Sequence, residues 1–208
     1  MIFDIVELSR KYNLKIKGTI VIGAFYGLNE EKAFAQLGIK NLAFFEPLEW
    51  SFAVLRNNFT GKYPIYQYAL GNENRKVIMN CEVDNGSMSS SILVPKKHLE
   101  YYPYIHFTEE LKREVEMIRL DDFNDLDFDK YNALNIDVQG YELEVLKGAK
   151  YVVETFIDYI FCEVNREELY ENCARIEQVD QFLNEFARVE TCWTPYGFGD
   201  ALYIRNNI

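Results

Sequence analysis

Residues 135–149, NIDVQGYELEVLKGA, constrain the fold of this chain more than any other segment. Mostly apolar residues on both sides of Asp137 are typical of a strand buried on both faces of a parallel sheet. Gly140 then provides a turn into a helix whose glutamates fall in the first turn, as the helix dipole favours. Asp137 therefore lies at the carboxyl end of a buried strand, and that edge of an open α/β sheet is where ligands bind.

Composition and length indicate a globular protein. The chain has 208 residues, 49% of them hydrophobic and 26% charged, which fits a single domain over residues 1–208. A helix is expected within residues 1–18, closed by Gly18. No apolar run approaches the length of a membrane span, and the acidic N-terminus makes a poor signal peptide, so we expect no membrane span and a cytoplasmic location.

The net charge and the cysteines narrow the possible partners and environment. A net charge of −11 disfavours nucleic acid, because binding a phosphate backbone normally requires a basic face. Cys81, Cys162, Cys173 and Cys192 are far apart and form no C-x-x-C pair. Reduced core thiols are therefore the preferred interpretation.

Strands and helices alternate along the first part of the chain. The pattern predicts strands over residues 19–24, 41–45 and 65–70, with helices over 29–37 and 49–59 between them. The first strand enters a glycine turn, Gly23 to Gly27, and Asn29 is the expected cap of the helix that follows. The second strand ends on Glu46, at about the spacing that places an acid against a ribose in dinucleotide-binding folds.

The pattern is interrupted between residues 83 and 114 and then resumes. This insertion is first small and polar and then crowded with aromatic residues, which predicts a loop that forms a lid. Later strands are expected over 115–120, 159–164, 189–193 and 201–204, with a helix over 175–186. The fold class is thus α/β: a doubly wound, Rossmann-like sheet, mostly parallel, with an antiparallel strand at one edge.

Four of these features come from the carboxyl ends of strands in the same sheet: the turn at 23–27, Glu46, Asp137 and Glu163. Each feature alone is weak, because a glycine turn is often only a turn and a carboxylate often only caps a helix. Together they predict a site for a ligand that contains a nucleoside.

The segment NIDVQGYELEVLKGA also resembles the most recognisable motif of the FkbM-type methyltransferases, which transfer a methyl group from S-adenosylmethionine to an oxygen atom. FEP (45–47), YALGNEN (68–74), GSMSSSIL (86–93) and LDDF (120–123) match the same family in the same order. The resemblance covers residues 19–164 and implies the seven-stranded class I methyltransferase fold, with its last strand antiparallel.

The resemblance also implies a donor site. Glu46 would accept hydrogen bonds from the ribose hydroxyls, and the turn would approach the methionine end of the donor. The residues implied for donor binding are Gly23, Ala24, Phe25, Tyr26, Gly27, Glu46, Pro47, Ala69, Leu70 and Asp137. Val21 and Phe25 depart from the family, which usually has aspartate and often asparagine there, and these departures imply weaker donor affinity.

Methyl transfer to an alcohol needs a group that accepts the hydroxyl proton, or a metal ion that acidifies the oxygen. Asp137 is the best-placed candidate. With Glu163 it would suit Mg²⁺ or Mn²⁺, which prefer oxygen ligands. The equal alternative is that Asp137 binds the donor or the substrate by hydrogen bonds without a metal. His106, in the aromatic part of the insertion, is a second candidate base.

The aromatic part of the insertion could contact the acceptor. Tyr101, Tyr102 and Tyr104, with His98, are candidates for binding the apolar side of a sugar ring, and simple packing or a homodimer contact is the alternative. The leading hypothesis is O-methylation of a sugar hydroxyl of a glycan. A fainter resemblance to the methyltransferase domain of a large-virus glycan-building protein implies a deoxyhexose such as rhamnose.

Two further hypotheses remain open at the level of sequence. The acceptor could be a polyketide or another small natural product on the same fold. Alternatively, the chain could be a non-catalytic donor-binding module in a glycosyltransferase assembly, and it could be fused to glycosyltransferase domains. This hypothesis is motivated by Val21, which stands where the family usually has aspartate.

Overall fold

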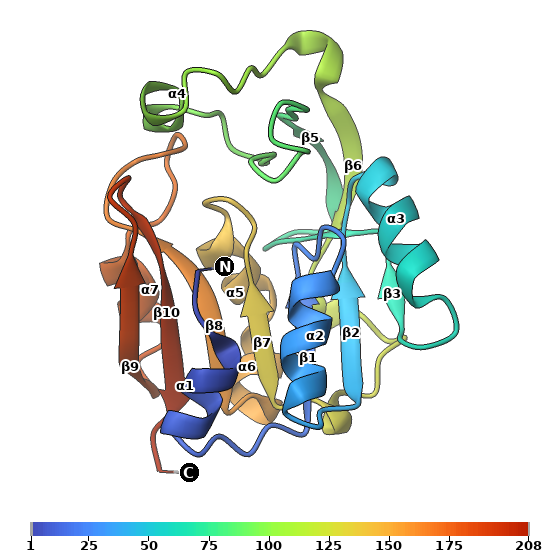
Figure 1. Cartoon of the computed structure of the whole chain (residues 1–208), viewed down its shortest axis with the longest axis vertical. Coiled ribbons are helices and arrows are strands. Elements are labelled where there is room, and N and C mark those ends of the chain that lie inside the picture. The colour runs from blue at the N-terminus through green and yellow to red at the C-terminus, as the bar shows by residue number, and fades with distance from the viewer. Residues whose placement is uncertain (1, 208) are drawn as a thin grey trace.

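A seven-stranded sheet forms the centre of the computed structural model, which describes residues 2–207 (Figure 1). Its strand order is β3-β2-β1-β7-β8-β10-β9. The strands are β1 (Gly18–Ile22), β2 (Asn41–Phe45), β3 (Ile65–Tyr66), β7 (Ala133–Ile136), β8 (Tyr159–Asn165), β9 (Phe186–Trp193) and β10 (Phe198–Arg205).

Pairing within this sheet confirms the predicted fold class. The neighbours from β3 to β8 pair in parallel, for example with Ile20 beside Leu134 and Ala43. The last strand, β10, is antiparallel to both β8 and β9, so the final hairpin forms one edge. All carboxyl ends of the parallel strands therefore meet at the upper edge in Figure 1.

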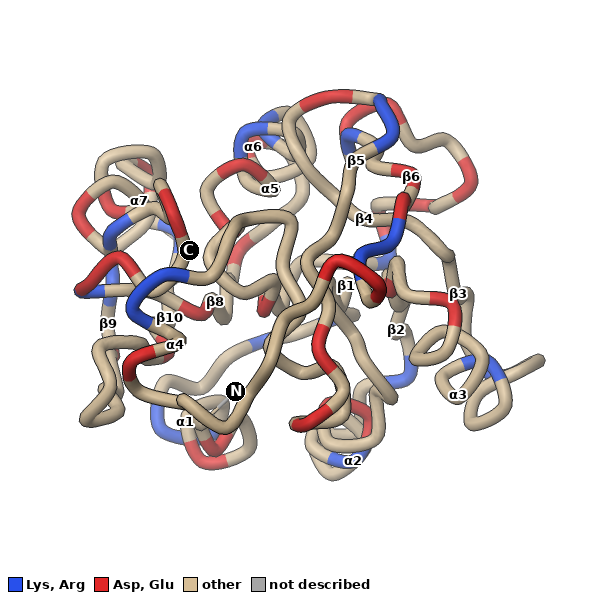
Figure 2. The backbone as a smooth tube through the Cα atoms, turned by 90° about the horizontal axis from the view of Figure 1, so that it is seen from above, with Lys and Arg blue, Asp and Glu red and all other residues tan. Residues whose placement is uncertain are grey.

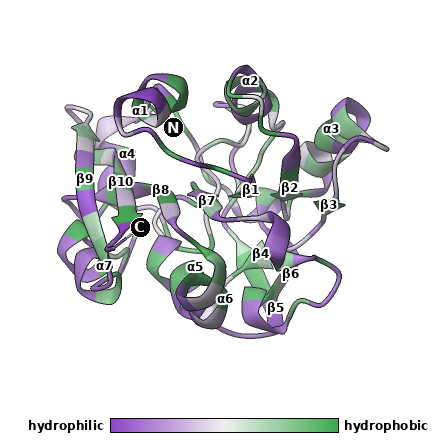
Figure 3. Ribbon diagram, turned by 90° about the horizontal axis from the view of Figure 1, so that it is seen from below, coloured by the Kyte–Doolittle hydropathy of each residue, from purple (hydrophilic) through white to green (hydrophobic). Residues whose placement is uncertain are grey.

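Helices cover both faces of the sheet, as Figure 3 shows from below. One face carries α1 (Ile5–Lys11), α2 (Leu28–Gln36) and α3 (Glu49–Phe59), and the other carries α5 (Glu142–Gly148), α6 (Lys150–Phe156) and α7 (Ile176–Phe182). Short 3₁₀ helices occur at Glu109–Leu111, Leu120–Asp122 and Phe128–Lys130. None of the helices among residues 2–207 has the length and apolarity that crossing a bilayer requires.

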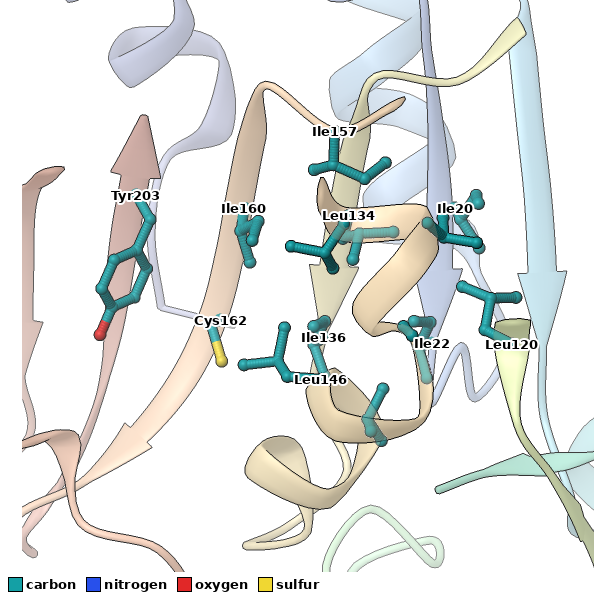
Figure 4. Packing of buried hydrophobic residues seen from close by; sticks show 14 of the residues in the cluster. Ile20, Ile22, Leu120, Leu134, Ile136, Leu146, Ile157, Ile160, Cys162 and Tyr203 are labelled. Atoms are coloured by element: carbon teal, nitrogen blue, oxygen red, sulfur yellow. The ribbon is translucent and has the colours of Figure 1, made fainter. Parts of the chain in front are cut away.

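Strand residues supply the two faces alternately, because successive side chains of a strand point to opposite sides. In β1, Ile20 and Ile22 belong to the cluster under α5 and α6, whereas Val21 belongs to the cluster under α1 and α2. Figure 4 shows Ile20, Ile22 and their neighbours packed in the first of these clusters. The sheet is therefore buried on both faces, and this burial fixes the position of each strand end.

A second, three-stranded sheet was not expected from the sequence. It has the order β4-β6-β5 and consists of β4 (Ala69–Leu70), β5 (Arg75–Met79) and β6 (Arg113–Ile118). The single strand predicted over 65–70 is wrong, because β3 pairs with β2 and β4 pairs with β6. The apolar residues of the second sheet pack against one another in a separate cluster. Their burial stabilises a sheet that is separate from the main one.

Several predicted helix ends are also wrong. The helix expected within residues 1–18 ends at Lys11, because Asn13 adopts a left-handed backbone (φ 51°) and Gly18 already pairs in β1. Gly27, not Asn29, precedes the first turn of α2. The helix expected over 175–186 ends at Phe182, since Phe186 begins β9.

The insertion lies across the upper edge of the main sheet (Figure 1). It is not a plain loop, because it contains α4 (Lys97–Tyr101), and its last residues belong to β6. The serines at 87, 89, 90 and 91 are all buried. The serine-rich half of the insertion is therefore packed into the protein and is not an exposed loop. Of the four cysteines, Cys192 is exposed and the other three are buried thiols.

Candidate active site

Two adjoining cavities open at the carboxyl edge of the main sheet. The larger has a volume of about 540 Å³ and the smaller about 70 Å³. Both are lined by Gly23, Phe25, Met88, Asp137 and Gln139. A molecule could therefore extend from the small cavity into the large one past Asp137.

The glycine turn after β1 lies between the strands that carry the site. The backbone N–H groups of Gly23 and Ala24 donate to the carbonyl oxygen of Phe45 at 3.1 and 3.0 Å. Phe25 has a left-handed backbone (φ 51°), and its ring stacks on Tyr26 with centroids 3.7 Å apart. The asparagine that the family often has at this position would adopt this conformation with less strain. Phenylalanine at position 25 therefore adds backbone strain and also removes a polar side chain from the turn.

Glu46 links this turn to the end of β2. Its carboxylate accepts hydrogen bonds from the backbone N–H groups of Phe25 and Leu48, each at 2.9 Å. Burial raises the pKa of Glu46 to about 7. Each carboxylate oxygen has a second lone pair, so these bonds leave room for two ligand hydroxyls.

The small cavity contains the other residues implied for the adenosine end of the donor. Pro47, Ala69 and Leu70 line it beside Glu46. Several of its walls were not predicted from the sequence. They come from the second sheet and the residue before it, from the serine-rich segment and from the Asp137 motif: Tyr68, Met79, Ser87, Ser90, Ile92, Val138 and Tyr141. The GSMSSSIL match was the available signal for the serines.

The large cavity has an acidic lining. Its charged side chains are Glu30, Asp137, Glu163 and Asp200, and among residues 2–207 no lysine or arginine lines it. Burial raises the pKa of Glu30, raises that of Glu163 well above its usual range, and raises that of Asp200 to about 6. The cavity therefore favours cations and neutral groups over phosphates.

Asp137 and Glu163 are brought together, as predicted, but a side chain lies between them. Gln139 Nε2 donates to Asp137 Oδ1 at 2.8 Å and approaches the two Glu163 oxygens at 3.1 and 3.2 Å. No group of three or more His, Cys, Asp or Glu side chains within residues 2–207 could hold a metal ion. An amide N–H is no metal ligand, so the predicted Mg²⁺ or Mn²⁺ site does not fit this arrangement.

The two histidines lie in different environments, and the prediction for His106 does not match the structure. The His106 side chain is 69% exposed, its Nδ1 lies 3.1 Å from Asp84, and it does not line the large cavity. His98 lines that cavity, is 4% exposed, and packs against the rings of Tyr102 and Tyr170. Within residues 2–207 its Nδ1 has no hydrogen-bond partner, and burial lowers its pKa to about 4.

The three tyrosines of the insertion also differ in whether they line the large cavity. Tyr102 and Tyr104 line the large cavity. Tyr101 points elsewhere, since its hydroxyl donates to Glu167 at 2.9 Å. The structure therefore brings Tyr102, Tyr104 and His98 to the candidate acceptor space and leaves Tyr101 and His106 outside it.

The three lysines of the insertion form ion pairs. Lys96 and Lys97 lie 2.6 and 2.5 Å from Glu168 and Glu167, and Lys112 lies 2.6 Å from Glu109. Figure 2 shows the basic start of α4 from above, with acidic segments on α2 and α7. The mouth of the large cavity thus gains no free lysine from the insertion.

Comparison with known proteins identifies the fold and the family. Methyltransferase FkbM from Methylobacillus flagellatus KT shares the fold with a TM-score of 0.56 at 14% identity, over 90% of this chain and 43% of that one. Magnesium protoporphyrin IX methyltransferase from Synechocystis PCC 6803, solved with S-adenosylmethionine bound, has a TM-score of 0.52 at 10% identity, over 97% of this chain and 76% of that one. The fold is that of the class I methyltransferases. This chain spans less than half of the Methylobacillus protein.

The sequence comparison is more specific. The Methyltransferase FkbM domain model matches residues 22–189. The 2-O-methyltransferase NoeI of Sinorhizobium fredii (strain NBRC 101917 / NGR234) is 27% identical over 187 residues, which cover 86% of this chain and 75% of NoeI. The chain belongs to the FkbM methyltransferase family and is an S-adenosylmethionine-dependent methyltransferase.

Proposed function

We propose that this enzyme transfers the methyl group of S-adenosylmethionine to a hydroxyl of an uncharged sugar in a glycan. The adenosine end of the donor occupies the small cavity, with Glu46 accepting from the ribose hydroxyls. The methionine end passes the glycine turn, and the sulfonium enters the large cavity beside Asp137. The carboxylates there stabilise its positive charge.

The observation that carries this proposal is the position of Asp137 on the boundary between the two cavities. The acceptor hydroxyl attacks the methyl carbon as the carbon–sulfur bond breaks, and its proton passes to the Asp137 carboxylate. The sulfonium becomes a neutral thioether. One proton acceptor next to the reacting oxygen is enough for this reaction, and its contribution is about 10²–10⁴-fold.

The shape and charge of the large cavity support a neutral acceptor. Tyr102 and Tyr104 offer aromatic faces to the apolar side of a sugar ring, and the acidic wall repels phosphates. NoeI is named a 2-O-methyltransferase, so a 2-hydroxyl is the first position to test. A deoxyhexose such as rhamnose, with its methyl group, suits the aromatic wall.

The rim of the large cavity favours one alternative acceptor class. Leu28, Met88 and Tyr104 line the cavity and are 52%, 50% and 61% exposed. Exposed apolar residues at a cavity mouth often contact an apolar ligand. A polyketide or other small natural product would pack against this rim. A lipid or aglycone attached to a sugar would pack against it in the same way.

A panel of acceptors tests the proposal. The protein is incubated with S-adenosylmethionine and neutral deoxyhexosides, the matching sugar nucleotides, or polyketide alcohols, and one added methyl group is detected by mass spectrometry. We expect methylation of the deoxyhexosides and little of the sugar nucleotides. Methylation of the polyketides alone would support the alternative acceptor. Donor binding without transfer to any acceptor would support a non-catalytic module in a glycosyltransferase assembly.

A further inference from the structure

The amide group of Gln139 occupies the space between the two carboxyl groups that line the site. Its Nε2 lies 2.8 Å from Asp137 Oδ1 and within 3.2 Å of both Glu163 oxygens. An amide nitrogen carries two hydrogens, so it can donate to both carboxyl groups at once. Gln139 thereby fixes the side chains of Asp137 and Glu163 relative to each other.

The orientation of this amide is set by a further contact. The Tyr170 hydroxyl lies 3.1 Å from Gln139 Oε1 and 2.8 Å from the Ser89 carbonyl oxygen, and it can donate to either. Two carboxyl groups on one side and a hydroxyl donor on the other favour Nε2 toward the acids and Oε1 toward Tyr170. Tyr170 is itself 2% exposed, so this donor is held in place by packing.

The backbone of Gln139 is also held in an unusual conformation. Its φ is +56°, in the left-handed region, which costs a non-glycine residue about 1 kcal/mol or more. Ser91 Oγ donates to the Gln139 carbonyl oxygen at 2.7 Å. The strained residue therefore has hydrogen bonds at its backbone and at its side-chain amide, and two of these come from the insertion and the segment after β8.

A divalent cation in this position would need an oxygen ligand where the N–H₂ group now lies. Mg²⁺ and Mn²⁺ are bound through oxygen atoms with free lone pairs, whereas an amide nitrogen donates hydrogens and repels a cation. An ion bound by both Asp137 and Glu163 would have to lie between them, and that position is taken by Gln139 Nε2. The interactions that hold the two acids together are thus provided by Gln139.

We propose that Gln139 is a positioning residue that holds Asp137 and Glu163 together in place of a metal ion, so that methyl transfer proceeds without a divalent cation. The claim that turnover needs no divalent cation rests on the proposed function. The metal-binding part of the proposal does not, because ion binding is measured without any acceptor or donor. A second consequence is that glutamate at position 139 would create a three-carboxylate site for Mn²⁺.

The first experiment measures Mn²⁺ binding by electron paramagnetic resonance with the full chain. We expect no stoichiometric binding by the wild type and one bound ion in Gln139→Glu. Gln181→Glu, an exposed position on α7, adds the same charge away from the site and should bind no ion. One tightly bound Mn²⁺ in the wild type would overturn the proposal, and so would a folded Gln139→Glu variant that binds none.

The second experiment measures turnover with an identified acceptor. Gln139→Met keeps the length of the side chain but removes both donors, so kcat should fall about 10–100-fold through misplacement of Asp137, with little change in the donor KM. Chelator should leave the wild type active. Unchanged kcat in Gln139→Met, or loss of wild-type activity in chelator, would contradict the proposal.

Tyr170→Phe is a milder variant that tests the same interaction if Gln139→Met does not fold. Tyr170→Phe removes only the hydroxyl that orients the amide, so kcat should fall several-fold while the donor KM is retained. A kcat equal to that of the wild type in folded Tyr170→Phe would show that the amide orientation does not matter and would overturn its role. If no acceptor is methylated at all, the proposed function fails, whereas the Mn²⁺ result still decides the metal-binding part.

Discussion

The backbone carbonyl oxygen of Asp137 lies 1.9 Å from the point where a Cβ atom on Gly23 would stand. Gly23 also has a left-handed backbone, with φ +74°. Only glycine lets the turn after β1 approach the end of β7 this closely. This contact places the proposed donor-binding turn against the candidate catalytic aspartate, and it is possible only because residue 23 has no Cβ atom.

Gly23→Ala should therefore disrupt the donor site. The new methyl group would collide with a backbone atom, which cannot move aside like a flexible side chain, so we expect loss of donor binding and destabilisation by at least about 1–3 kcal/mol. Calorimetry and thermal unfolding measure the two effects. Gly38→Ala is the matched control, since its φ is +76° and no heavy atom of the described residues lies within 4 Å of its Cβ position. Equal effects of the two substitutions would show that backbone strain alone is responsible.

Donor affinity should increase with pH through the titration of Glu46. Its pKa is raised from 4.5 to about 7 by burial, so the free enzyme is mostly protonated there at pH 6 and mostly ionised at pH 8. Ribose hydroxyls donate more strongly to the ionised form, and the ionised fraction rises about tenfold over this range, so Kd should fall by about that factor.

Glu46→Gln is the control for this pH effect. It should bind the donor more weakly at pH 8 and show a flat profile between pH 6 and pH 8, measured by calorimetry in matched buffers. The same slope in the variant and the wild type would assign the pH dependence to another group.

The two histidines should respond differently to substitution. His98→Ala removes a ring from the wall of the large cavity, so the acceptor KM should rise about tenfold or more while the donor KM changes little. His106→Ala, on the exposed side of the insertion, should leave both constants near their wild-type values. Steady-state kinetics with an identified acceptor measure both, and the reverse order of effects would restore His106 as the functional histidine.

The fold was largely predictable because each strand of the main sheet is buried on both faces. Such strands appear in the sequence as continuous apolar runs, as at residues 19–24 and 133–136, and each leads into a helix with clear end signals. The second sheet was missed because β4 has only two residues, and its partner β6 follows after more than forty residues. Short strands with distant partners leave no local periodicity.

The convergence of Gly23, Glu46 and Asp137 at one edge was also predictable, because these residues follow strand ends and the ends of parallel strands meet at one edge. The insertion was less predictable. Its sequence shows aromatic residues without periodicity, so nothing distinguished the inward-facing His98 from the exposed His106. The bridge formed by Gln139 depends on a left-handed backbone and on Tyr170, which lies 31 residues further along the chain. Neither is visible in sequence.

Asp137 carries the central claim, because it is the carboxylate that lines both cavities and it lies within the family's main motif. Asp137→Asn keeps the shape of the side chain and removes the negative charge that accepts the proton. Turnover should therefore fall by about 10²–10⁴-fold, whereas donor affinity should stay near the wild-type value.

The most direct measurement follows the transfer of a deuterated methyl group from S-adenosylmethionine to a neutral deoxyhexoside by mass spectrometry, under single-turnover conditions with saturating donor. We predict rapid transfer by the wild type, with and without chelator, and transfer slower by about 10²–10⁴-fold in Asp137→Asn despite full occupancy by the donor. Transfer by folded Asp137→Asn at the wild-type rate would contradict the placement of the catalytic centre at Asp137.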